Sequence, residues 1–508
     1  MPRGRSSLLL LPLAALMSAA AAFCPPRCRC DDITLTADCT GAQLDSFPIT
    51  LNPRLRRLIL VDNAIRRLDT SMVSSYTHLE FLDMRRNGML SVQANSFERQ
   101  QRLLELRLGQ NQLGQLEEGV FNGLRRLRVL DLSANQLREV PDDALRPLQM
   151  LTDLDLSENR LAALSRDALS GAVSLRRLSL ASNLLTAVPT EALQQLSQLD
   201  DLSLAGNSIE RLSAGELGRA APALTQLSLA GNRIAPLPDG VFDGLAGLRQ
   251  LNVADIGLDS ADEETFTGLD RLEELHLSGN PLSRLGPAPL ERLHRLTLLS
   301  VRACPGLNTI EPDTFKHNPA LATLRLEENP NLTELPDKLL LFLPLLRSLS
   351  LHANSLSSLT ESTADWRNLA ADLGGNPWRC DCALRWLAEL PPEVNISGAI
   401  CAAPDRLRGT SVRGLSAEDL DCGAADSSSM GLVIGLSVGA AVLLLALAVG
   451  ACYRYRRRLH KMFKVLPWRE RVGLKRKQEP YHRGQTYYCH DMYDPIHPRD
   501  KPIPVTEL

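Results

Sequence analysis

The sequence of 508 residues is poor in aromatic side chains and nearly balanced in charge. Phe, Trp and Tyr make up 4% of it, whereas hydrophobic residues make up 44%, and leucine is the most frequent of these. A chain with few aromatics and much of one aliphatic residue indicates a periodic core, because repeats reuse the same core residue. The high apolar content and a net charge of only −3 exclude disorder over most of the length.

Catalytic motifs are also missing. The chain contains no H-E-x-x-H metal motif, no phosphate-binding glycine loop with lysine, and no G-x-S-x-G nucleophile motif. Residues 453–508 are too few for a kinase or a Toll-type signalling domain, because domains of typical size need about 100 residues. We therefore expect binding rather than catalysis, a protein that is not an enzyme, and no cofactor.

The small net charge conceals an uneven distribution. Residues 453–508 carry 14 Lys and Arg against 6 Asp and Glu, a balance of +8, and Arg3 and Arg5 add +2, so residues 23–430 hold −13. No nucleic-acid partner is expected, because such proteins need the basic charge on the folded face. An acidic body joined to a basic tail instead suits a chain that crosses a membrane.

Two apolar segments support this prediction. Residues 1–22 contain arginines, then an apolar run, then small residues, as in a secretory signal peptide. Residues 430–453 hold no charged residue and are long enough to span roughly 30 Å of hydrocarbon. The arginines that follow place the C-terminal side in the cytoplasm by the positive-inside rule. We predict a single-pass type I protein of the plasma membrane, with its N-terminus outside the cell.

Between these segments a leucine pattern returns every 24 or 25 residues. The pattern L-x-x-L-x-L-x-x-N-x-L begins at Leu55 and occurs thirteen times, with the asparagine kept in eleven copies. Its L-x-L part alternates inward and outward, so each copy adds one strand to a parallel sheet on the inner side of a curved solenoid. The asparagine amide would bond to backbone groups of the turn. Ile256 and Cys304 replace it in copies nine and eleven, where we expect a looser turn and a buried free thiol.

A solenoid exposes its core at both ends, and cysteines flank the repeats on both sides. Zinc is the competing interpretation of such clusters, but a secreted segment favours disulfides. The spacing of the cysteines leaves their pairing open. The clusters consist of Cys24, Cys28, Cys30 and Cys39 before the repeats, and of Cys380, Cys382, Cys401 and Cys422 after them.

The repeats and both cysteine clusters resemble the extracellular leucine-rich-repeat family over nearly all of residues 23–422. The plan is similar to single-pass members of the trophoblast glycoprotein, capricious–tartan and neuronal kinds. The resemblance implies an α/β leucine-rich-repeat solenoid with disulfide caps, one transmembrane helix and a disordered tail. It also implies the cystine pairs Cys24–Cys30, Cys28–Cys39, Cys380–Cys401 and Cys382–Cys422.

These observations divide the chain into seven segments. The expected boundaries are 1–22 for the signal peptide, 23–54 for the N-terminal cysteine cap, 55–368 for thirteen leucine-rich repeats, 369–422 for the C-terminal cysteine cap, 423–429 for a linker, 430–453 for the transmembrane helix and 454–508 for the cytoplasmic tail.

Side chains between the core leucines of each strand are expected on the concave face. The charged N-terminal third of this face is the predicted ligand-binding surface, although a merely solvated face would carry charges as well. The candidate residues are Arg57, Phe81, Arg85, Arg86, Arg107, Asp131, Asp153 and Asp155.

Short motifs predict modification and dimerisation. Asn331 and Asn395 begin glycan acceptor sequences, and Cys452 at the inner membrane boundary is a candidate for palmitoylation. Three glycines would share one face of the transmembrane helix and support a dimer, although glycine is common in such helices. They are Gly431, Gly435 and Gly439.

The tail carries two kinds of candidate interaction signal. Tyr487, Tyr488 and Tyr493 predict phosphotyrosine or sorting signals. Thr506 and Leu508 occupy the positions of a C-terminal PDZ ligand. We expect cytoplasmic PDZ or phosphotyrosine adaptors as partners.

The sequence therefore predicts a cell-surface recognition protein. It would bind an extracellular protein ligand or a receptor on a neighbouring cell, in adhesion or as a co-receptor, and recruit adaptors through its tail. The alternative is an auxiliary subunit that modulates a channel or receptor in the same membrane. In that case the transmembrane glycines and the membrane-proximal cap would carry the function.

Overall fold

The computed structural model describes residues 24–234, 236–422 and 439–456. The chain divides into two units, residues 1–425 and 426–508. The predicted signal peptide, the linker 423–429 and the tail beyond residue 456 lie outside the described residues.

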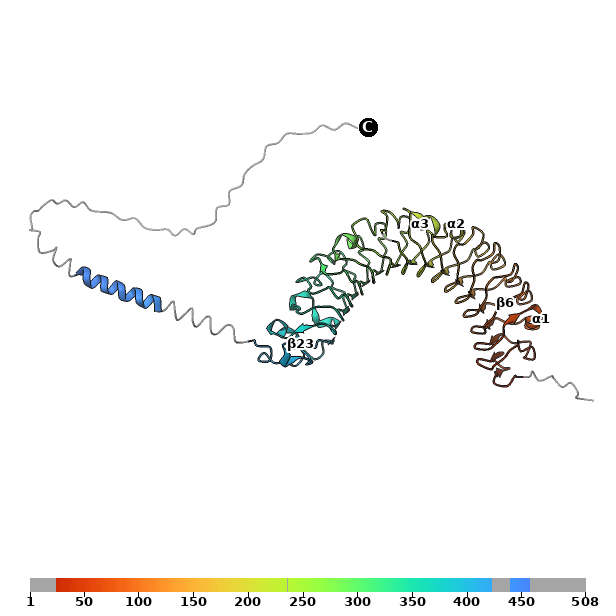
Figure 1. Ribbon diagram of the computed structural model, residues 1–508, viewed down its shortest axis with the longest axis horizontal. Helices are drawn as coiled ribbons and strands as arrows, with labels where there is room; N and C mark the ends of the chain where they lie inside the picture. Colours follow the sequence, from red (N-terminus) through yellow and green to blue (C-terminus); the bar gives the residue numbers. More distant parts are fainter. Residues whose placement is uncertain (1–23, 235, 423–438, 457–508) are drawn as a thin grey trace, which may run out of the picture. The chain divides into compact units, whose positions relative to one another are not determined.

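The first unit is a solenoid whose inner side is one 17-stranded sheet (Figure 1). The strands follow one another in chain order, and every neighbouring pair is parallel except the first, β1 with β2. The sheet consists of β1 (Arg29–Asp31), β2 (Thr36–Asp38), β3 (Arg57–Ile59), β5 (Phe81–Asp83), β7 (Glu105–Arg107), β8 (Val129–Asp131), β9 (Asp153–Asp155), β10 (Arg177–Ser179), β11 (Asp201–Ser203), β12 (Gln226–Ser228), β13 (Gln250–Asn252), β14 (Glu274–His276), β16 (Leu298–Ser300), β18 (Thr323–Arg325), β19 (Ser348–Ser350), β20 (Ala370–Asp372) and β22 (Ile396–Ser397).

The thirteen leucine copies supply the sheet strands from β3 to β19. Each of these strands is three residues long, and its central leucine is at most 3% exposed. Because neighbouring side chains of a strand point to opposite faces, the first and third side chains face the concave side. The predicted parallel-sheet solenoid is confirmed. We call each coil of this stack a rung and number the rungs from β3.

The asparagine of a rung ties its turn to the preceding rung. In rung six, Asn183 donates from Nδ2 to the carbonyl oxygen of Leu156 in rung five (2.9 Å) and to that of Leu180 in its own rung (3.1 Å). Its Oδ1 accepts the backbone N–H of Leu161 in rung five (3.0 Å). Asn183 is 5% exposed, so these bonds pair backbone groups that would otherwise be buried without partners.

The stack contains one more rung than the thirteen leucine copies. Strand β20 carries Ala371 where the other strands have leucine, and Asn376 donates to three backbone carbonyls as the repeat asparagines do. In all fourteen rungs the residue before the asparagine position is left-handed, from Asp62 (φ 58°) to Gly375 (φ 69°). The start of the segment expected as a cap therefore continues the solenoid.

Rung nine lacks the asparagine but keeps the geometry of the turn. Ile256 is 1% exposed, and Asp255 before it has φ 53°, as in the other rungs. The N–H groups of residues 256–258 all donate to Oδ1 of Asn280 in the next rung (3.0–3.1 Å). The expectation of a looser turn is wrong, because the neighbouring asparagine bonds to the turn amides.

Rung eleven uses a thiol instead of the amide. Cys304 is fully buried, and its Sγ donates to the carbonyl oxygens of Leu277 in rung ten (3.7 Å) and of Arg302 (3.5 Å). Burial raises the pKa of this thiol. The predicted buried free thiol is present, and it contacts the same kind of backbone oxygen as the missing amide.

The convex side is built from turns and short helical segments around a second apolar ladder. Five phenylalanines of this ladder are at most 1% exposed: Phe97, Phe121, Phe242, Phe266 and Phe315. The remaining elements are α1 (Thr70–Val73), α2 (Thr190–Leu193), α3 (Glu216–Ala220), α4 (Arg385–Ala388), the 3₁₀ turns η1 (Ala288–Leu290), η2 (Glu361–Thr363), η3 (Trp366–Asn368), η4 (Cys382–Leu384) and η5 (Asp405–Leu407), and the pairs β4 (Arg67–Leu68) with β6 (Ser91–Val92), β15 (Arg284–Leu285) with β17 (Thr309–Ile310), and β21 (Trp378–Arg379) with β23 (Cys401–Ala403).

Both ends of the core are covered. At the first end β1 turns back antiparallel on β2. At the other end Arg413 donates to the carbonyl oxygens of Pro391 (2.9 Å) and Val394 (2.6 Å) beside β22. The disulfides are the pairs that the resemblance implies: Cys24–Cys30, Cys28–Cys39, Cys380–Cys401 and Cys382–Cys422.

The described part of the second unit is a helix over Gly439–Arg456. Its 18 residues are long and apolar enough to cross a membrane. The transmembrane helix expected over 430–453 overlaps it, and the observed helix continues three residues further, to Arg456.

Candidate functional site

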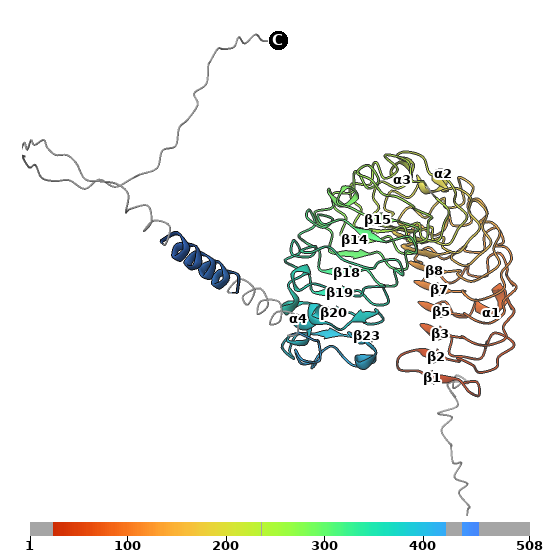
Figure 2. The same ribbon diagram turned by 60° about the vertical axis from the view of Figure 1, so that its left-hand side comes forward.

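Two rows of side chains cover the N-terminal part of the concave face. Strands β3, β5, β7, β8 and β9 pair in this order and in register, and the first four are labelled side by side in Figure 2. Their first residues form one row and their third residues a second, since alternate side chains of a strand share a face. We call these rows the charged face: Arg57, Phe81, Glu105, Val129 and Asp153 in the first row, and Ile59, Asp83, Arg107, Asp131 and Asp155 in the second.

Phe81 lies beneath two guanidinium groups. The Cζ atom of Arg57 is 3.9 Å from the centroid of the ring, and that of Arg107 is 5.3 Å from it. Each cation is attracted to the negative face of the ring. Phe81 is only 6% exposed as a result. It therefore supports the two arginines and is covered by them, rather than offering an aromatic anchor to a ligand.

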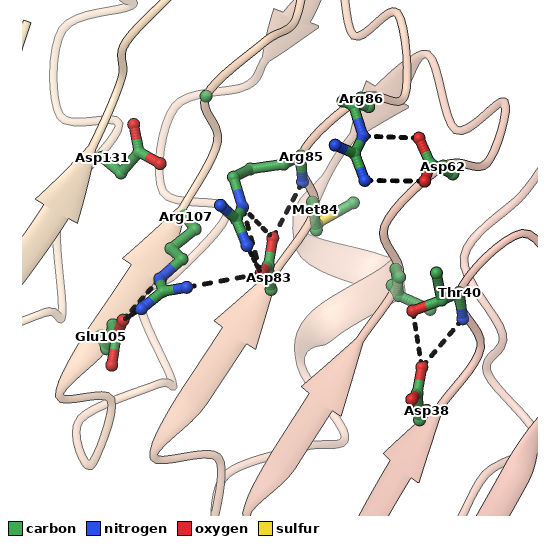
Figure 3. A network of polar contacts seen from close by, with 12 residues as sticks. Asp38, Thr40, Asp62, Asp83, Met84, Arg85, Arg86, Glu105, Arg107 and Asp131 are labelled. Atoms are coloured by element: carbon green, nitrogen blue, oxygen red, sulfur yellow. Dashed lines mark hydrogen bonds and ion pairs between the residues drawn. The ribbon is translucent and has the colours of Figure 1, made fainter. Parts of the chain in front are cut away.

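Asp83 is the centre of the polar network in this face (Figure 3). Its carboxylate accepts Nε (3.0 Å) and Nη2 (2.7 Å) of Arg85, and it lies 3.9 Å from Nη1 of Arg107. The hydrogen bonds to Asp83 raise the pKa of Arg85, while burial acts in the opposite direction. Such two-pronged, charge-assisted pairing fixes both side chains.

Sequence reasoning missed Asp83. The residue occupies the same strand position as Asp131 and Asp155, and nothing in the repeat pattern distinguishes it from them. Its side chain is 4% exposed because the two arginines cover it, and that contact depends on side-chain positions that the pattern does not encode.

The other predicted basic residues differ in how they are neutralised. Arg86 pairs with Asp62 through Nε–Oδ1 (2.6 Å) and Nη2–Oδ2 (2.8 Å), and Nε of Arg107 donates to Glu105 (2.5 Å). Within the part of the chain that the structure describes, no ion pair joins Arg57 to a carboxylate. Arg57 thus has no carboxylate partner among the described residues, whereas Arg85, Arg86 and Arg107 each have one.

Rungs four and five bring acidic side chains. Asp131 accepts the N–H (3.0 Å) and the hydroxyl (2.6 Å) of Ser133, and Asp155 accepts the same groups of Ser157 (2.9 and 2.6 Å). No ion pair to Lys or Arg engages either carboxylate among the residues described. Asp153, by contrast, is paired with Arg177 of rung six. The described residues also contain no group of three or more His, Cys, Asp and Glu that could hold a metal ion.

In rungs six to eight the concave face carries fewer charged side chains than in rungs one to five, and titratable groups occur further along it as well. Burial, followed by the nearby Asp200, raises the pKa of Asp201 in rung seven. Burial lowers the pKa of His276 in rung ten, against the effect of Glu274. These side chains do not join the Asp83 network.

The predicted modification sites remain predictions. Asn331 and Asn395 are exposed, as glycan acceptors must be, and Nδ2 of Asn331 donates to the carbonyl oxygen of Pro305 (2.7 Å). On the helix of the second unit, Cys452 is an exposed free thiol, and Gly439 is the first helical residue. The other candidates lie outside the described residues: Gly431, Gly435, Tyr487, Tyr488, Tyr493, Thr506 and Leu508.

Comparison with protein families agrees with this architecture. The family model described as leucine rich repeat matches residues 77–137, 101–161, 125–185, 173–234, 222–282, 246–305 and 294–356. The chain belongs to the leucine-rich-repeat family. The model of the leucine rich repeat C-terminal domain matches residues 398–423 and includes two of the paired cysteines.

Curated relatives are cell-surface leucine-rich-repeat proteins. Trophoblast glycoprotein of Mus musculus is 29% identical over 289 residues, which cover 44% of this chain and 68% of the relative. The Macaca fascicularis protein is 30% identical over 39% of this chain and 59% of its own length. Leucine-rich repeat transmembrane protein FLRT2 of Mus musculus is 27% identical over 39% of this chain, but this covers only 27% of FLRT2.

Solved structures share the fold. TLR13 in its complex with ssRNA13 has a TM-score of 0.53 at 23% identity, covering 69% of this chain and 59% of that chain. A leucine-rich-repeat protein of Leptospira interrogans has a TM-score of 0.53 at 24% identity, covering 71% and 94%. At these identities the likeness concerns the solenoid alone.

Proposed function

We propose that this chain is a cell-surface recognition protein whose charged face binds a protein ligand. The observation that carries the proposal is the arrangement of rungs one to five. There Arg57 is held over an aromatic ring, and Asp131 and Asp155 are held by serines and form no ion pair with Lys or Arg among the described residues. Side chains that are already fixed lose less conformational entropy on binding, which favours a binding surface over a merely solvated one.

The relatives and the helix support a position at the cell surface. Trophoblast glycoprotein and FLRT2 carry the words glycoprotein and transmembrane protein in their names, and this chain has a helix suited to crossing a membrane. In our proposal residues 1–22 direct secretion, the helix anchors the solenoid with its N-terminus outside, and the tail recruits adaptors. The ligand is then another extracellular protein, bound in adhesion or co-reception.

A single substitution tests where the ligand binds. Asp155→Asn creates an Asn-Leu-Ser glycan acceptor with Leu156 and Ser157, on the charged face. The full-length protein is displayed on cells and presented with a panel of multimerised ectodomains of cell-surface proteins. Any ectodomain that binds the wild type should lose at least about tenfold in affinity, because the glycan occupies the space of the ligand.

Two control variants show whether a loss of binding comes from the position of the glycan or from the loss of the Asp155 carboxylate. Ser348→Asn creates the same kind of acceptor in rung thirteen, eight rungs away, and should leave binding intact. Asp155→Ala removes the carboxylate without adding a glycan. Gel mobility before and after deglycosylation shows whether each glycan is attached. Binding that survives Asp155→Asn and is lost with Ser348→Asn would contradict the proposed surface.

An exchange of the membrane helix distinguishes this proposal from the alternative of an auxiliary subunit. Replacing Gly439–Arg456 with an unrelated transmembrane helix should leave binding to an ectodomain on another cell unchanged. Loss of function after that exchange, with the charged face intact, would favour a subunit that acts within its own membrane.

A further inference from the structure

The arrangement of paired and unpaired charges specifies the chemistry of the partner. We propose that Arg57 is the anchor for a carboxylate of the ligand, and that the ligand is a protein segment that is acidic at one end and basic at the other. Its acidic part would lie against rungs one to three, and its basic part against Asp131 and Asp155 in rungs four and five. This inference rests on the proposed function and deepens it.

Among the described residues, no ion pair engages Arg57, so its guanidinium can form a new two-pronged contact. Arg85, Arg86 and Arg107 each donate to a carboxylate, that of Asp83, Asp62 and Glu105 respectively. Cζ of Arg57 lies over the ring of Phe81, 3.9 Å from its centroid. Stacking of this kind leaves the N–H edges available, and those edges match the geometry of a carboxylate.

The acidic side of the face argues against a uniformly anionic ligand. Neighbouring strands are about 4.8 Å apart, so Asp131 and Asp155 lie roughly 14 and 19 Å from Arg57 along the sheet. A polyanion that covered all five rungs would bring like charges onto both carboxylates. At physiological salt charges interact over about 8 Å, so the two ends of the face act separately on the ligand. A peptide whose charge changes from negative to positive over this distance would place an acidic group near Arg57 and a basic group near Asp131 and Asp155.

Defined peptides test the proposal on the full-length chain reconstituted in lipid nanodiscs. The probe is Glu-Glu-Glu-Gly-Gly-Lys-Lys-Lys, displayed on streptavidin tetramers and measured by biolayer interferometry. A uniformly acidic peptide of the same length and heparin are the comparison ligands. The mixed peptide should bind the wild type at least about fivefold more tightly than the acidic peptide does, because only it matches both ends.

Substitutions then locate the anchor. Arg57→Ala should weaken the mixed peptide by about tenfold, and Arg57→Lys by less, because lysine keeps the charge but loses the fork. Arg325→Ala is the control, because Arg325 is an exposed arginine of the same sheet in rung twelve, outside the charged face. It should change affinity less than twofold. Phe81→Leu should also weaken binding, since the guanidinium loses its support.

Three outcomes would overturn the inference. They are unchanged affinity in the Arg57→Ala and Phe81→Leu variants, tighter binding of the acidic peptide or heparin than of the mixed peptide, and failure of the mixed peptide to bind. Circular dichroism of each variant excludes unfolding as the cause of a loss. The glycan experiment above is independent of these peptides, so a protein ligand blocked by Asp155→Asn would leave the proposed function standing even if the charge pattern proved wrong.

Discussion

Rungs one to five and rungs six to eight have the same backbone and display different chemistry. Strands β3 to β12 share one register, a buried central leucine and an asparagine after each strand. The repeat residues fix the scaffold, and the concave positions are free to vary, so function must be argued from those positions rather than from the fold. The second row carries Asp83, Arg107, Asp131 and Asp155 in the first group, and Ser179, Ser203 and Ser228 in the second.

If the scaffold is the same in both groups, core substitutions should have equal effects. Leu106→Ala in rung three and Leu202→Ala in rung seven remove side chains that are at most 1% exposed. Each should lower the free energy of unfolding by about 2–5 kcal/mol, through lost burial and the cavity left behind. Urea unfolding followed by circular dichroism measures both. A difference of more than about 2 kcal/mol between them would show that the scaffolds are not equivalent.

Substitutions in the second row should change the free energy of unfolding more in rungs one to five than in rungs six to eight. Asp83→Ala removes the carboxylate that holds Arg85, and should lower the free energy of unfolding by about 1–2 kcal/mol. Ser203→Ala at the equivalent position in rung seven should change it by less than about 0.5 kcal/mol. The same unfolding measurement applies. Equal effects of the two substitutions would mean that the Asp83 network does not stabilise the charged face.

A smaller difference is expected between two exposed arginines. Arg57→Ala removes the cation over Phe81, and should lower the free energy of unfolding by about 0.5–1 kcal/mol. Arg177→Ala breaks an exposed ion pair with Asp153, and should lower it by about 0.3 kcal/mol. Thermal unfolding of the two variants tests the order. If Arg177→Ala lowered the free energy of unfolding more than Arg57→Ala, the contact between Arg57 and Phe81 would not stabilise the charged face as proposed.

The smallest effect concerns pH. The pKa of Asp201 is raised above 3.8 in the folded state, so the folded chain binds more protons than the unfolded chain just above that pH. Stability contributed by the neutral form is therefore lost as the pH rises through the folded pKa. Asp201→Ser should stabilise the protein at pH 7 by on the order of 0.3 kcal/mol, since the side chain is partly exposed and screened.

Unfolding at several pH values checks this expectation. The gain from Asp201→Ser should shrink as the pH falls through the folded pKa and below 3.8, because Asp201 then becomes protonated in both states. Asp201→Asn is unsuitable for the purpose, because it would create a glycan acceptor with Ser203. If the stabilisation by Asp201→Ser grew at low pH, the pKa of Asp201 would be lowered in the folded state instead of raised.

Much of the scaffold could be predicted from the sequence because its period is strict. The leucine spacing predicts the parallel sheet, and the asparagine predicts the bonded turn. The leucine count misses rung fourteen, because Ala371 replaces the central leucine while Asn376 keeps its role. The turn at Ile256 was also mispredicted, since its amides bond to Asn280 of another rung. The pattern of a single repeat does not reveal hydrogen bonds that its turn forms with the next repeat.

The site could be predicted only in outline. The sequence places Arg57, Phe81 and the acidic residues on the concave face, and the strand register agrees with this. The sequence does not show which of these charged side chains form ion pairs with one another. Arg85 and Arg86 are paired through bonds to Asp83 and Asp62 that depend on side-chain conformation. Among the described residues of the charged face those pairings leave Arg57 without an ion pair, and this could be recognised only with the side chains in place.

Footprinting of carboxylates in a ligand complex tests the central claim most directly. The full-length protein is labelled with a carbodiimide and an amine, with and without its bound ligand, and the modified residues are identified by mass spectrometry. Our account predicts that Asp131 and Asp155 become protected while Glu274 and Asp372, further along the same concave face, stay as reactive as before. Protection of Glu274 and Asp372 with Asp131 and Asp155 unchanged would contradict it.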